Sequence, residues 1–210
     1  MDMKVLLLNG STRNKGCTYT ALVEVAKTLE ENGVSSEIIN IGNQPVRDCT
    51  NCRKCAELDN ACVFNDDIVN EILRKAKDAD GFVFGTPVYY AHPSGQILSV
   101  LDRMFYAGGG VFSHKPGAAI ASARRAGTVA SVDVLNKYFT INQMPVVSST
   151  YWNEVHGSTA EEVHQDLEGM QTMRNLGRNM AWLLKCIEIG KQHGITTPTS
   201  ERTYSTNFIR

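Results

Sequence analysis

The regular alternation of short apolar runs with amphipathic stretches is the feature of this sequence that most constrains its fold. The apolar runs are bounded by turn residues, which is typical of strands buried on both faces. The stretches between them repeat apolar residues every three or four positions, which predicts helices packed by one face. We therefore expect strands at residues 4–9, 36–41, 81–85, 117–122 and 144–148, and helices at 18–32, 66–78, 94–105, 128–139 and 160–191.

Strands that alternate with helices predict an α/β domain with a parallel sheet. Five such strands most commonly form a flavodoxin-like, doubly wound sheet in the order 2-1-3-4-5, with helices on both faces. A chain of 210 residues accommodates one such domain, which we place at residues 1–194 with a cysteine-rich insertion at about 43–64. Residues 195–210 show no periodicity, so we expect them to form a C-terminal arm or tail.

The charge balance narrows the range of partners. Twenty-one Lys and Arg residues stand against 22 Asp and Glu, and the formal net charge is -1. This balance provides no basic surface for nucleic acid or for an anionic membrane, so we expect neither as a partner. The sequence has no apolar stretch of membrane-spanning length and no secretory signal pattern at its start, which predicts a cytoplasmic protein.

The loop after the first strand has the composition of an anion-binding site. In a doubly wound sheet, a ligand binds beyond the carboxyl ends of the strands. Hydroxyls and N–H donors at a helix start favour a phosphate there, whereas the alternative is an ordinary turn with a threonine cap. The loop lacks both G-x-x-x-x-G-K-[ST] and G-x-G-x-x-G, which counts against ATP and a Rossmann-type dinucleotide. The candidate residues are Ser11, Arg13, Gly16, Cys17 and Thr18.

The loops after the third and fourth strands add aromatic and basic side chains at the same edge of the sheet. Two tyrosines lie between two prolines, and such exposed rings on a stiff backbone suit a flat aromatic ligand. Two arginines lie beside a further helix start. The alternatives are tyrosines packed at a strand end and arginines on a solvated surface. The candidate residues are Pro87, Val88, Tyr89, Tyr90, Ser122, Arg124, Arg125 and Gly127.

Three segments that occur in order resemble the NADPH-dependent FMN reductase group of flavodoxin-like proteins: GSTRNKGCT, TPVYYAHPSGQILSVLDR and SARRAGT. The resemblance spans about residues 4–150 and implies FMN as cofactor and NAD(P)H as co-substrate. It implies that residues 87–90 line the isoalloxazine ring and that residues 122–127 border its pyrimidine end. It also implies that the FMN phosphate is held by Ser11, Arg13, Cys17 and Thr18. Cys17 departs from the Ser or Asn common in the family and leaves a weak side-chain donor.

Four of the six cysteines lie within 14 positions, at Cys49, Cys52, Cys55 and Cys62. Such crowding is not a distributed disulfide framework. Three cysteines at successive x2 spacings are typical of the run that binds a [4Fe-4S] cluster, and the segment resembles the compact cysteine motif of the iron-sulfur flavoproteins. A zinc site is an alternative, although zinc more often pairs two C-x2-C units across a longer gap. Free thiols or a disulfide are the remaining interpretation.

The family resemblance implies an FMN-dependent oxidoreductase that accepts hydride from NAD(P)H and passes electrons to a small acceptor such as a quinone or free flavin. Two alternatives are an iron-sulfur flavoprotein that carries single electrons and a non-catalytic FMN-binding module. We name no catalytic side chain because the flavin carries the chemistry. The open flavin rim, the aromatic pair Tyr151 and Trp152 and the C-terminal arm predict a homodimer or homotetramer.

Overall fold

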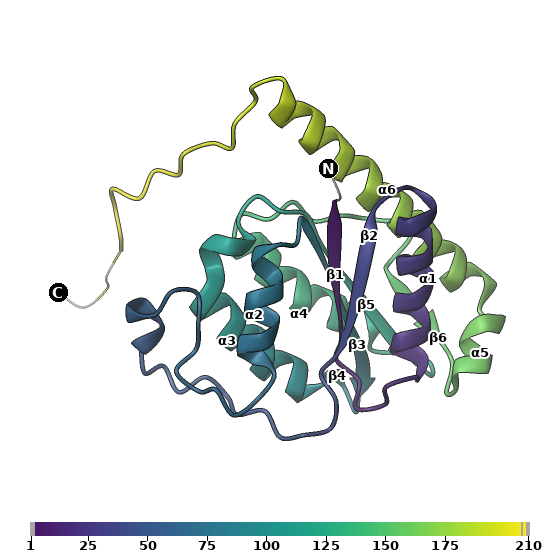
Figure 1. Cartoon of the computed structure of the whole chain (residues 1–210). Coiled ribbons are helices and arrows are strands. Elements are labelled where there is room, and N and C mark those ends of the chain that lie inside the picture. The colour runs from purple at the N-terminus through teal and green to yellow at the C-terminus, as the bar shows by residue number, and fades with distance from the viewer. Residues whose placement is uncertain (1–2, 207, 209–210) are drawn as a thin grey trace.

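The computed structural model describes residues 3–206 and 208, so residues 1–2 of the predicted domain and residues 207, 209 and 210 of the predicted arm lie outside the described residues. The chain forms a parallel sheet between two layers of helices (Figure 1). The strands are β1 (Lys4–Asn9), β2 (Ser35–Asn40), β3 (Gly81–Tyr89), β4 (His92–Pro93), β5 (Gly117–Ala123) and β6 (Glu154–His156). The helices are α1 (Cys17–Glu31), a 3-10 turn η1 (Lys54–Glu57), α2 (Val69–Lys77), α3 (Gly95–Phe112), α4 (Thr128–Ile141), α5 (Ala160–Gln165) and α6 (Leu167–Gln192).

The parallel strands follow the order β2-β1-β3-β5-β6, and the short β4 pairs antiparallel with the end of β3. This is the doubly wound order that the sequence predicts, but the sheet has six strands instead of five because of β4. The predicted end of the third strand at residue 85 was also wrong, since β3 continues to Tyr89. After Gly85 the pairing with β1 ends while pairing with β5 continues to Pro87, so β3 has one free edge where the missing proline N–H is tolerated.

The predicted fifth strand at residues 144–148 was wrong. Val146 makes only an isolated bridge to Gly117, at the beginning of β5. Met144 and Val147 are buried by packing against the helical layers, so their apolar character does not require a ladder. The pairing at the other end of β5 is made by β6, which lies parallel to Ala121–Ala123.

The alternation of side chains along β1 explains why its sequence is apolar throughout. Leu6 and Leu8 pack into the core with α2, α3 and α4, whereas Val5 and Leu7 pack into the core with α1 and α6 on the other face. Successive side chains of a strand point to opposite faces, so a strand covered on both sides has no solvent-facing position. All four residues have no exposed surface.

The helix boundaries differ from the predicted ones by more than two residues at three places. The single helix predicted over 160–191 is divided at Asp166, whose Oδ1 accepts a hydrogen bond of 2.9 Å from the N–H of Gly169 and caps α6. The second helix begins at Val69 instead of Asp66, and α3 continues past Phe105 to Phe112 through a non-helical residue at Gly108. No helix within residues 3–206 and 208 has the length and apolar character needed to cross a membrane.

The C-terminal segment leaves the body of the protein after α6. Residues 195–206 form neither helix nor strand and extend away from the helical layers (Figure 1). Ser200 donates a hydrogen bond of 2.6 Å from its hydroxyl to the side-chain oxygen of Gln143.

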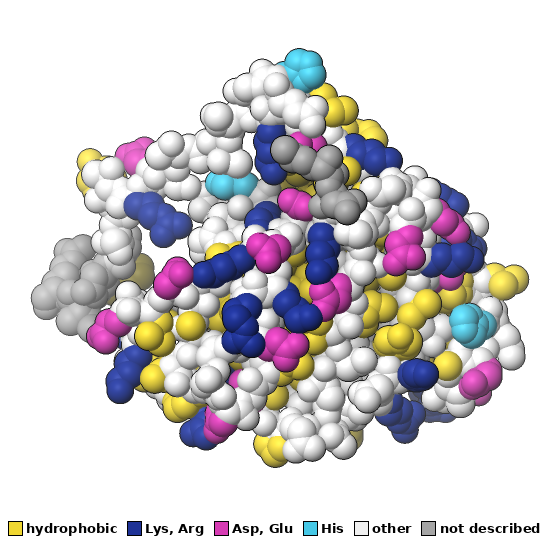
Figure 2. Space-filling view, in the orientation of Figure 1, with side chains coloured by type: hydrophobic (Ala, Val, Ile, Leu, Met, Phe, Trp, Pro, Cys, Tyr) yellow, Lys and Arg dark blue, Asp and Glu magenta, His cyan; other side chains and the backbone are white. Residues whose placement is uncertain are grey.

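On the face drawn in Figure 2, basic and acidic side chains are interspersed. Glu37 of β2, for example, forms ion pairs with Lys4 at 2.5 Å and with Lys75.

Candidate functional site

A cleft of about 290 Å³ lies at the carboxyl ends of the parallel strands. The loops that follow β1, β3, β5 and β6 contribute its walls, which is the edge where a doubly wound sheet binds its ligand. The lining residues are Ser11, Thr12, Arg13, Cys17, Thr18, Pro87, Val88, Tyr89, Ser122, Ala123, Arg124, Gly157 and Ser158. Hydroxyl groups and arginines therefore dominate its polar surface.

The loop after β1 is shaped by short-range hydrogen bonds between side chains and the backbone. The side-chain oxygen of Asn9 accepts from the N–H of Ser11 at 3.2 Å, and the Ser11 hydroxyl accepts from the N–H of Arg13 at 3.1 Å. Asn and Ser favour such turns because their side chains replace a backbone partner. These bonds turn the chain sharply and present residues 11–13 at the cleft.

Gly10 allows the same loop to approach the neighbouring strand. Its N–H donates to the carbonyl of Gly85 at 2.8 Å. A Cβ atom at Gly10 would lie 2.8 Å from that carbonyl oxygen and 2.7 Å from Cδ1 of Ile97, which is closer than real Cβ contacts. The carbonyl of Gly10 also accepts a 2.8 Å bond from the hydroxyl of Ser94, the residue that caps α3. The first loop is thus attached directly to the start of α3.

Two hydrogen bonds between hydroxyl groups join separate loops of the cleft. The hydroxyls of Thr18 and Ser122 lie 2.8 Å apart, and both residues are buried. The hydroxyls of Thr12 and Tyr89 lie 3.1 Å apart at the exposed rim. These two bonds connect segments that are far apart in sequence. The cleft therefore forms only where the strand order of the sheet brings several loops together.

The N-terminus of α1 contributes Cys17 and Thr18 to the lining of the cleft, and the N-terminus of α4 follows the end of β5 at the same edge of the sheet. Among the described residues, no side chain caps α1 or α4, and neither helix has an acidic residue in its first turn. Uncapped N–H groups and the helix dipole favour an anion at such positions. Arg13 and Arg124 add formal positive charge to the lining. The donor set therefore fits a phosphate at α1 and a partly negative ring edge near α4.

Cys17 contributes a neutral thiol to the lining. Burial raises the pKa of its thiol above the ordinary value, although its own backbone N–H and the charge of Arg13 act in the opposite direction. Its Sγ donates to the carbonyl oxygen of Gly157 at 3.4 Å. A thiol that is protonated at neutral pH and already bonded to a carbonyl is a poor nucleophile.

The structure gathers most of the predicted candidate residues at this cleft. From the three loops, it brings together Ser11, Arg13, Cys17, Thr18, Pro87, Val88, Tyr89, Ser122 and Arg124. The described lining does not include Gly16, Tyr90, Arg125 or Gly127. Tyr90 has a left-handed φ of 61° that turns it away, and it is fully exposed. Gly127 acts through the backbone, because it begins α4 with a left-handed φ of 90°.

Ala123 lies within the predicted segment 122–127, but sequence reasoning missed three lining residues: Thr12, Gly157 and Ser158. The last two follow β6, so placing the fifth strand at residues 144–148 moved the expected loop away from them. The signal for a short strand here was a single apolar residue, Val155, followed shortly by the turn residues Gly157 and Ser158.

A second cavity, of about 430 Å³, lies between the insertion after β2 and α3. Cys49, Cys52, Cys55 and Cys62 all line it. The residues on either side of Cys52 have left-handed backbones, with φ of 50° at residue 51 and 60° at residue 53. These two reversals curve the chain around the cavity, which is how cysteines at short spacing reach one volume.

The arrangement of the six cysteines bears on the three interpretations of the cysteine-rich segment. None of the six cysteines, all of which are described, forms a disulfide. Zinc bound to thiolates requires Zn–S distances of about 2.3 Å, so its ligands crowd around one point. Within residues 3–206 and 208, no three His, Cys, Asp or Glu side chains are placed to hold one metal ion. The four thiols line one cavity and could together hold a multi-iron cluster.

Helix α3 connects the two sites. Its cap, Ser94, supports the first loop of the cleft, and Arg103, Tyr106 and Ala107 line the cysteine cavity. At 1.5 Å per residue, positions 94 and 103 are about 14 Å apart along the helix axis. The two sites therefore share one rigid element.

Comparison with known proteins gives a consistent result. The family model described as NADPH-dependent FMN reductase matches residues 3–159. An iron-sulfur flavoprotein of Methanocaldococcus jannaschii is 31% identical over 194 residues, which cover 89% of this chain and 100% of that protein.

Solved structures share the fold at lower identity. An NAD(P)H:quinone oxidoreductase from Methanothermobacter marburgensis has a TM-score of 0.66 and 16% identity, and the match covers 86% of this chain and 100% of that one. A flavodoxin from the domain Archaea has a TM-score of 0.60 and 15% identity, covering 87% of this chain and 99% of that one. These likenesses establish the flavodoxin-like architecture.

Proposed function

The chain belongs to the NADPH-dependent FMN reductase family, with FMN as its cofactor, and from this premise we propose that it takes hydride from NAD(P)H and passes electrons to a small acceptor such as a quinone or free flavin. The observation that carries the proposal is the cleft at the carboxyl edge of the sheet. It combines the uncapped N-terminus of α1 with hydroxyl and guanidinium donors from the segments at the carboxyl ends of β1, β3, β5 and β6. This donor set suits a phosphorylated flavin more than a neutral ligand.

Each part of the cleft has a distinct task in this proposal. Ser11, Arg13 and Thr18 hold the phosphate at the N-terminus of α1, where N–H groups and positive charge converge. The segment from Pro87 to Tyr89 supplies a stiff wall against the ring. Arg124 and the start of α4 lie where negative charge on the pyrimidine edge is stabilised.

FMN, when bound, supplies two-electron acceptance from a nicotinamide and release of electrons singly or in pairs. The protein contributes binding, orientation and electrostatics. The Thr18–Ser122 bond fixes the spacing of the phosphate and pyrimidine ends of the cleft, because it links α1 to β5. The Thr12–Tyr89 bond holds the outer rim, which leaves the cleft open to a co-substrate.

We further propose that Cys49, Cys52, Cys55 and Cys62 bind a [4Fe-4S] cluster and that the protein also carries single electrons. Four thiols that line one cavity support this proposal, as does the iron-sulfur flavoprotein that matches along its whole length. The thiolates would hold the cluster, and Arg103, Tyr106 and Ala107 of α3 would form the wall of the cavity beside it.

Anaerobic purification with iron and sulfide analysis tests both proposals. We expect bound FMN whose absorption bleaches on addition of NADPH, together with the broad visible absorption of an iron-sulfur cluster. Flavin that binds but is not reduced by NADPH or NADH would favour a non-catalytic FMN-binding module. A protein that retains no flavin would contradict the proposed function altogether.

The variant Cys52→Ser separates the two cofactors. We expect it to retain FMN and reduction by NAD(P)H while losing the iron-sulfur absorption, because the sheet and the cleft do not depend on the insertion. Cys186→Ser is the matched control, since Cys186 is an exposed cysteine of α6 outside the insertion, and it should keep both chromophores. A Cys52→Ser protein that cannot fold or bind FMN would contradict this division of roles.

We also propose that the protein functions as a homodimer or homotetramer. Tyr151 and Trp152, which precede β6 and whose rings contact each other, are 60% and 54% exposed, and Tyr90 in the loop after β3 is fully exposed. Aromatic residues exposed together are typical of interfaces. Sedimentation of the FMN-loaded protein at micromolar concentration should give a dimer or tetramer, and a flavin-loaded monomer would contradict the proposal.

A further inference from the structure

Arg103 is the largest side chain that the fold buries completely. It lies on α3 beside Leu101 and Met104 and is 2% exposed. Burying a guanidinium is unfavourable unless its charge and its N–H groups find partners. The hydrogen-bond and ion-pair partners of the Arg103 guanidinium therefore show which segments this buried side chain holds against α3.

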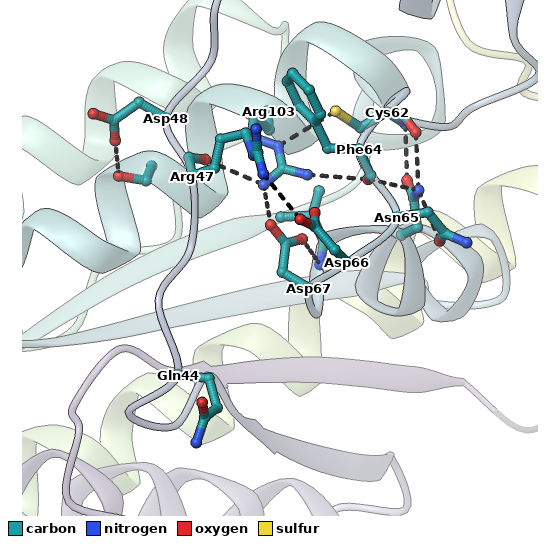
Figure 3. Close-up of polar contacts among 12 residues, drawn as sticks. Gln44, Arg47, Asp48, Cys62, Phe64, Asn65, Asp66, Asp67 and Arg103 are labelled. Atoms are coloured by element: carbon teal, nitrogen blue, oxygen red, sulfur yellow. Dashed lines mark hydrogen bonds and ion pairs between the residues drawn. The ribbon is translucent and has the colours of Figure 1, made fainter.

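All partners of Arg103 come from the insertion and the segment that follows it (Figure 3). Nη1 forms an ion pair with buried Asp67 and donates to the carbonyl of Arg47 at 3.1 Å. Nη2 donates to the carbonyl of Phe64 at 3.2 Å. The remaining donor, Nε, points to the Sγ of Cys62 at 3.3 Å. One side chain thus attaches both ends of the insertion to α3.

The bond from Nε to Cys62 differs in kind from the other three. The carbonyl and carboxylate contacts satisfy the guanidinium and hold the backbone. The sulfur contact instead reaches a side chain that lines the cysteine cavity, which Arg103 also lines. Hydrogen bonds to the sulfurs and nearby positive charge favour the more negative, reduced state of an iron-sulfur cluster.

We infer that Arg103 is a positioning residue that orients the Cys62 sulfur toward the cavity and raises the reduction potential of the cluster bound there. This inference rests on the proposed [4Fe-4S] cluster. Adding one electron to such a cluster adds one negative charge that its sulfurs share, and the N–H of Nε donates directly to one cysteine sulfur.

Asp67 sets how much of the arginine charge the cluster experiences. Its side chain is only 6% exposed and pairs with Arg103 in a region with little water to screen the charges. Removing the carboxylate charge while keeping an acceptor leaves the guanidinium uncompensated. Removing the charge of Arg103 and removing the charge of Asp67 should therefore shift the reduction potential in opposite directions. If the ion pair had only a structural role, either substitution would loosen the site and the two shifts would have the same sign.

A redox titration of the anaerobically reconstituted full-length protein, followed by visible absorption and EPR, tests the inference. For Arg103→Gln we expect the ratio of reduced to oxidised cluster at a fixed potential to fall about tenfold, which is about 59 mV for a one-electron couple. For Asp67→Asn the ratio should rise by about threefold or more, because the amide still accepts a hydrogen bond but carries no charge.

Arg47→Gln is the matched control. Arg47 is exposed, pairs with Asp66 at 2.9 Å, and its guanidinium carbon lies 4.5 Å from the centre of the Phe64 ring. Replacing it by Gln therefore removes an equal charge from the same insertion without changing a contact to Cys62. Solvent screening should keep its effect on the ratio within about twofold. If Arg103→Gln does not fold, Asp67→Asn still decides, since only an upward shift agrees with the inference.

The outcomes distinguish this inference from the function on which it rests. Parent protein that contains no iron after anaerobic reconstitution would overturn both. Parent protein with a cluster, combined with an unchanged potential in Arg103→Gln or with shifts of the same sign in Arg103→Gln and Asp67→Asn, would overturn only the role of Arg103.

Discussion

Replacing Arg13 by Ala should weaken FMN binding about tenfold while leaving riboflavin binding unchanged. A hydrogen bond to a charged group contributes about 1.5–3 kcal/mol. Arg13 lines the cleft but its side chain is exposed, so water and salt screen its charge and the lower end of that range applies. About 1.5 kcal/mol corresponds to about a tenfold change in the dissociation constant.

Titration of flavin-free protein, followed by quenching of flavin fluorescence, measures this change for FMN and riboflavin side by side. Lys15→Ala is the matched control, because Lys15 is an exposed cation of the same loop outside the described lining of the cleft, and its effect should stay within about threefold. The reasoning is refuted if the parent protein binds FMN and riboflavin equally well, or if Arg13→Ala weakens both to the same extent.

Three further substitutions test individual parts of the structure. Gly10→Ala should lower the free energy of unfolding by about 1–3 kcal/mol through overpacking against Gly85, and it should weaken FMN binding. Gly95→Ala is the control because a Cβ there meets open space, so urea and flavin titrations should show neither effect. Glu37→Gln should cost about 1 kcal/mol at pH 7, because hydrogen bonds from Lys4 and then Lys75 lower the pKa of Glu37. A lowered pKa stabilises the fold above the unfolded value of about 4.3, so this cost should disappear as urea titrations move to lower pH, and a cost that persists there would contradict the ion-pair origin. Cys17→Ser should tighten FMN binding a few-fold in calorimetry, since a hydroxyl is a stronger donor than a neutral thiol, and unchanged affinity would show that position 17 acts only through its backbone.

Local patterns sufficed to predict the parts of the fold in which burial and pairing agree. Residues 4–9 are apolar without interruption because both faces of β1 are covered, and the Gly-Ser turn after them marks the first wall of the cleft. The edge of the sheet could not be predicted in the same way. Residues 144–148 meet the beginning of β5 and residues 154–156 meet its end, and the longer pairing is made by the three residues with the weaker apolar pattern.

The cysteine cavity shows a similar division. The short spacings predicted that the four cysteines act together, and they do line one volume. The contribution of Arg103 was not predicted, because an arginine in an amphipathic helix is normally solvent-exposed. Its position between buried Leu101 and Met104 was the available signal, but the ion pair with Asp67 that makes burial acceptable exists only in the folded chain.

The attachment of the insertion to α3 has a consequence for how such proteins diversify. The insertion leaves the sheet after β2 and returns before α2, and a single side chain of α3 fastens both of its ends. The cysteines between these attachment points can therefore be gained, lost or exchanged while the cleft at the carboxyl edge of the sheet keeps its residues. Natural variation in electron-carrying capacity should then be concentrated in this one segment, and the sequences of the loops around the cleft should vary independently of it.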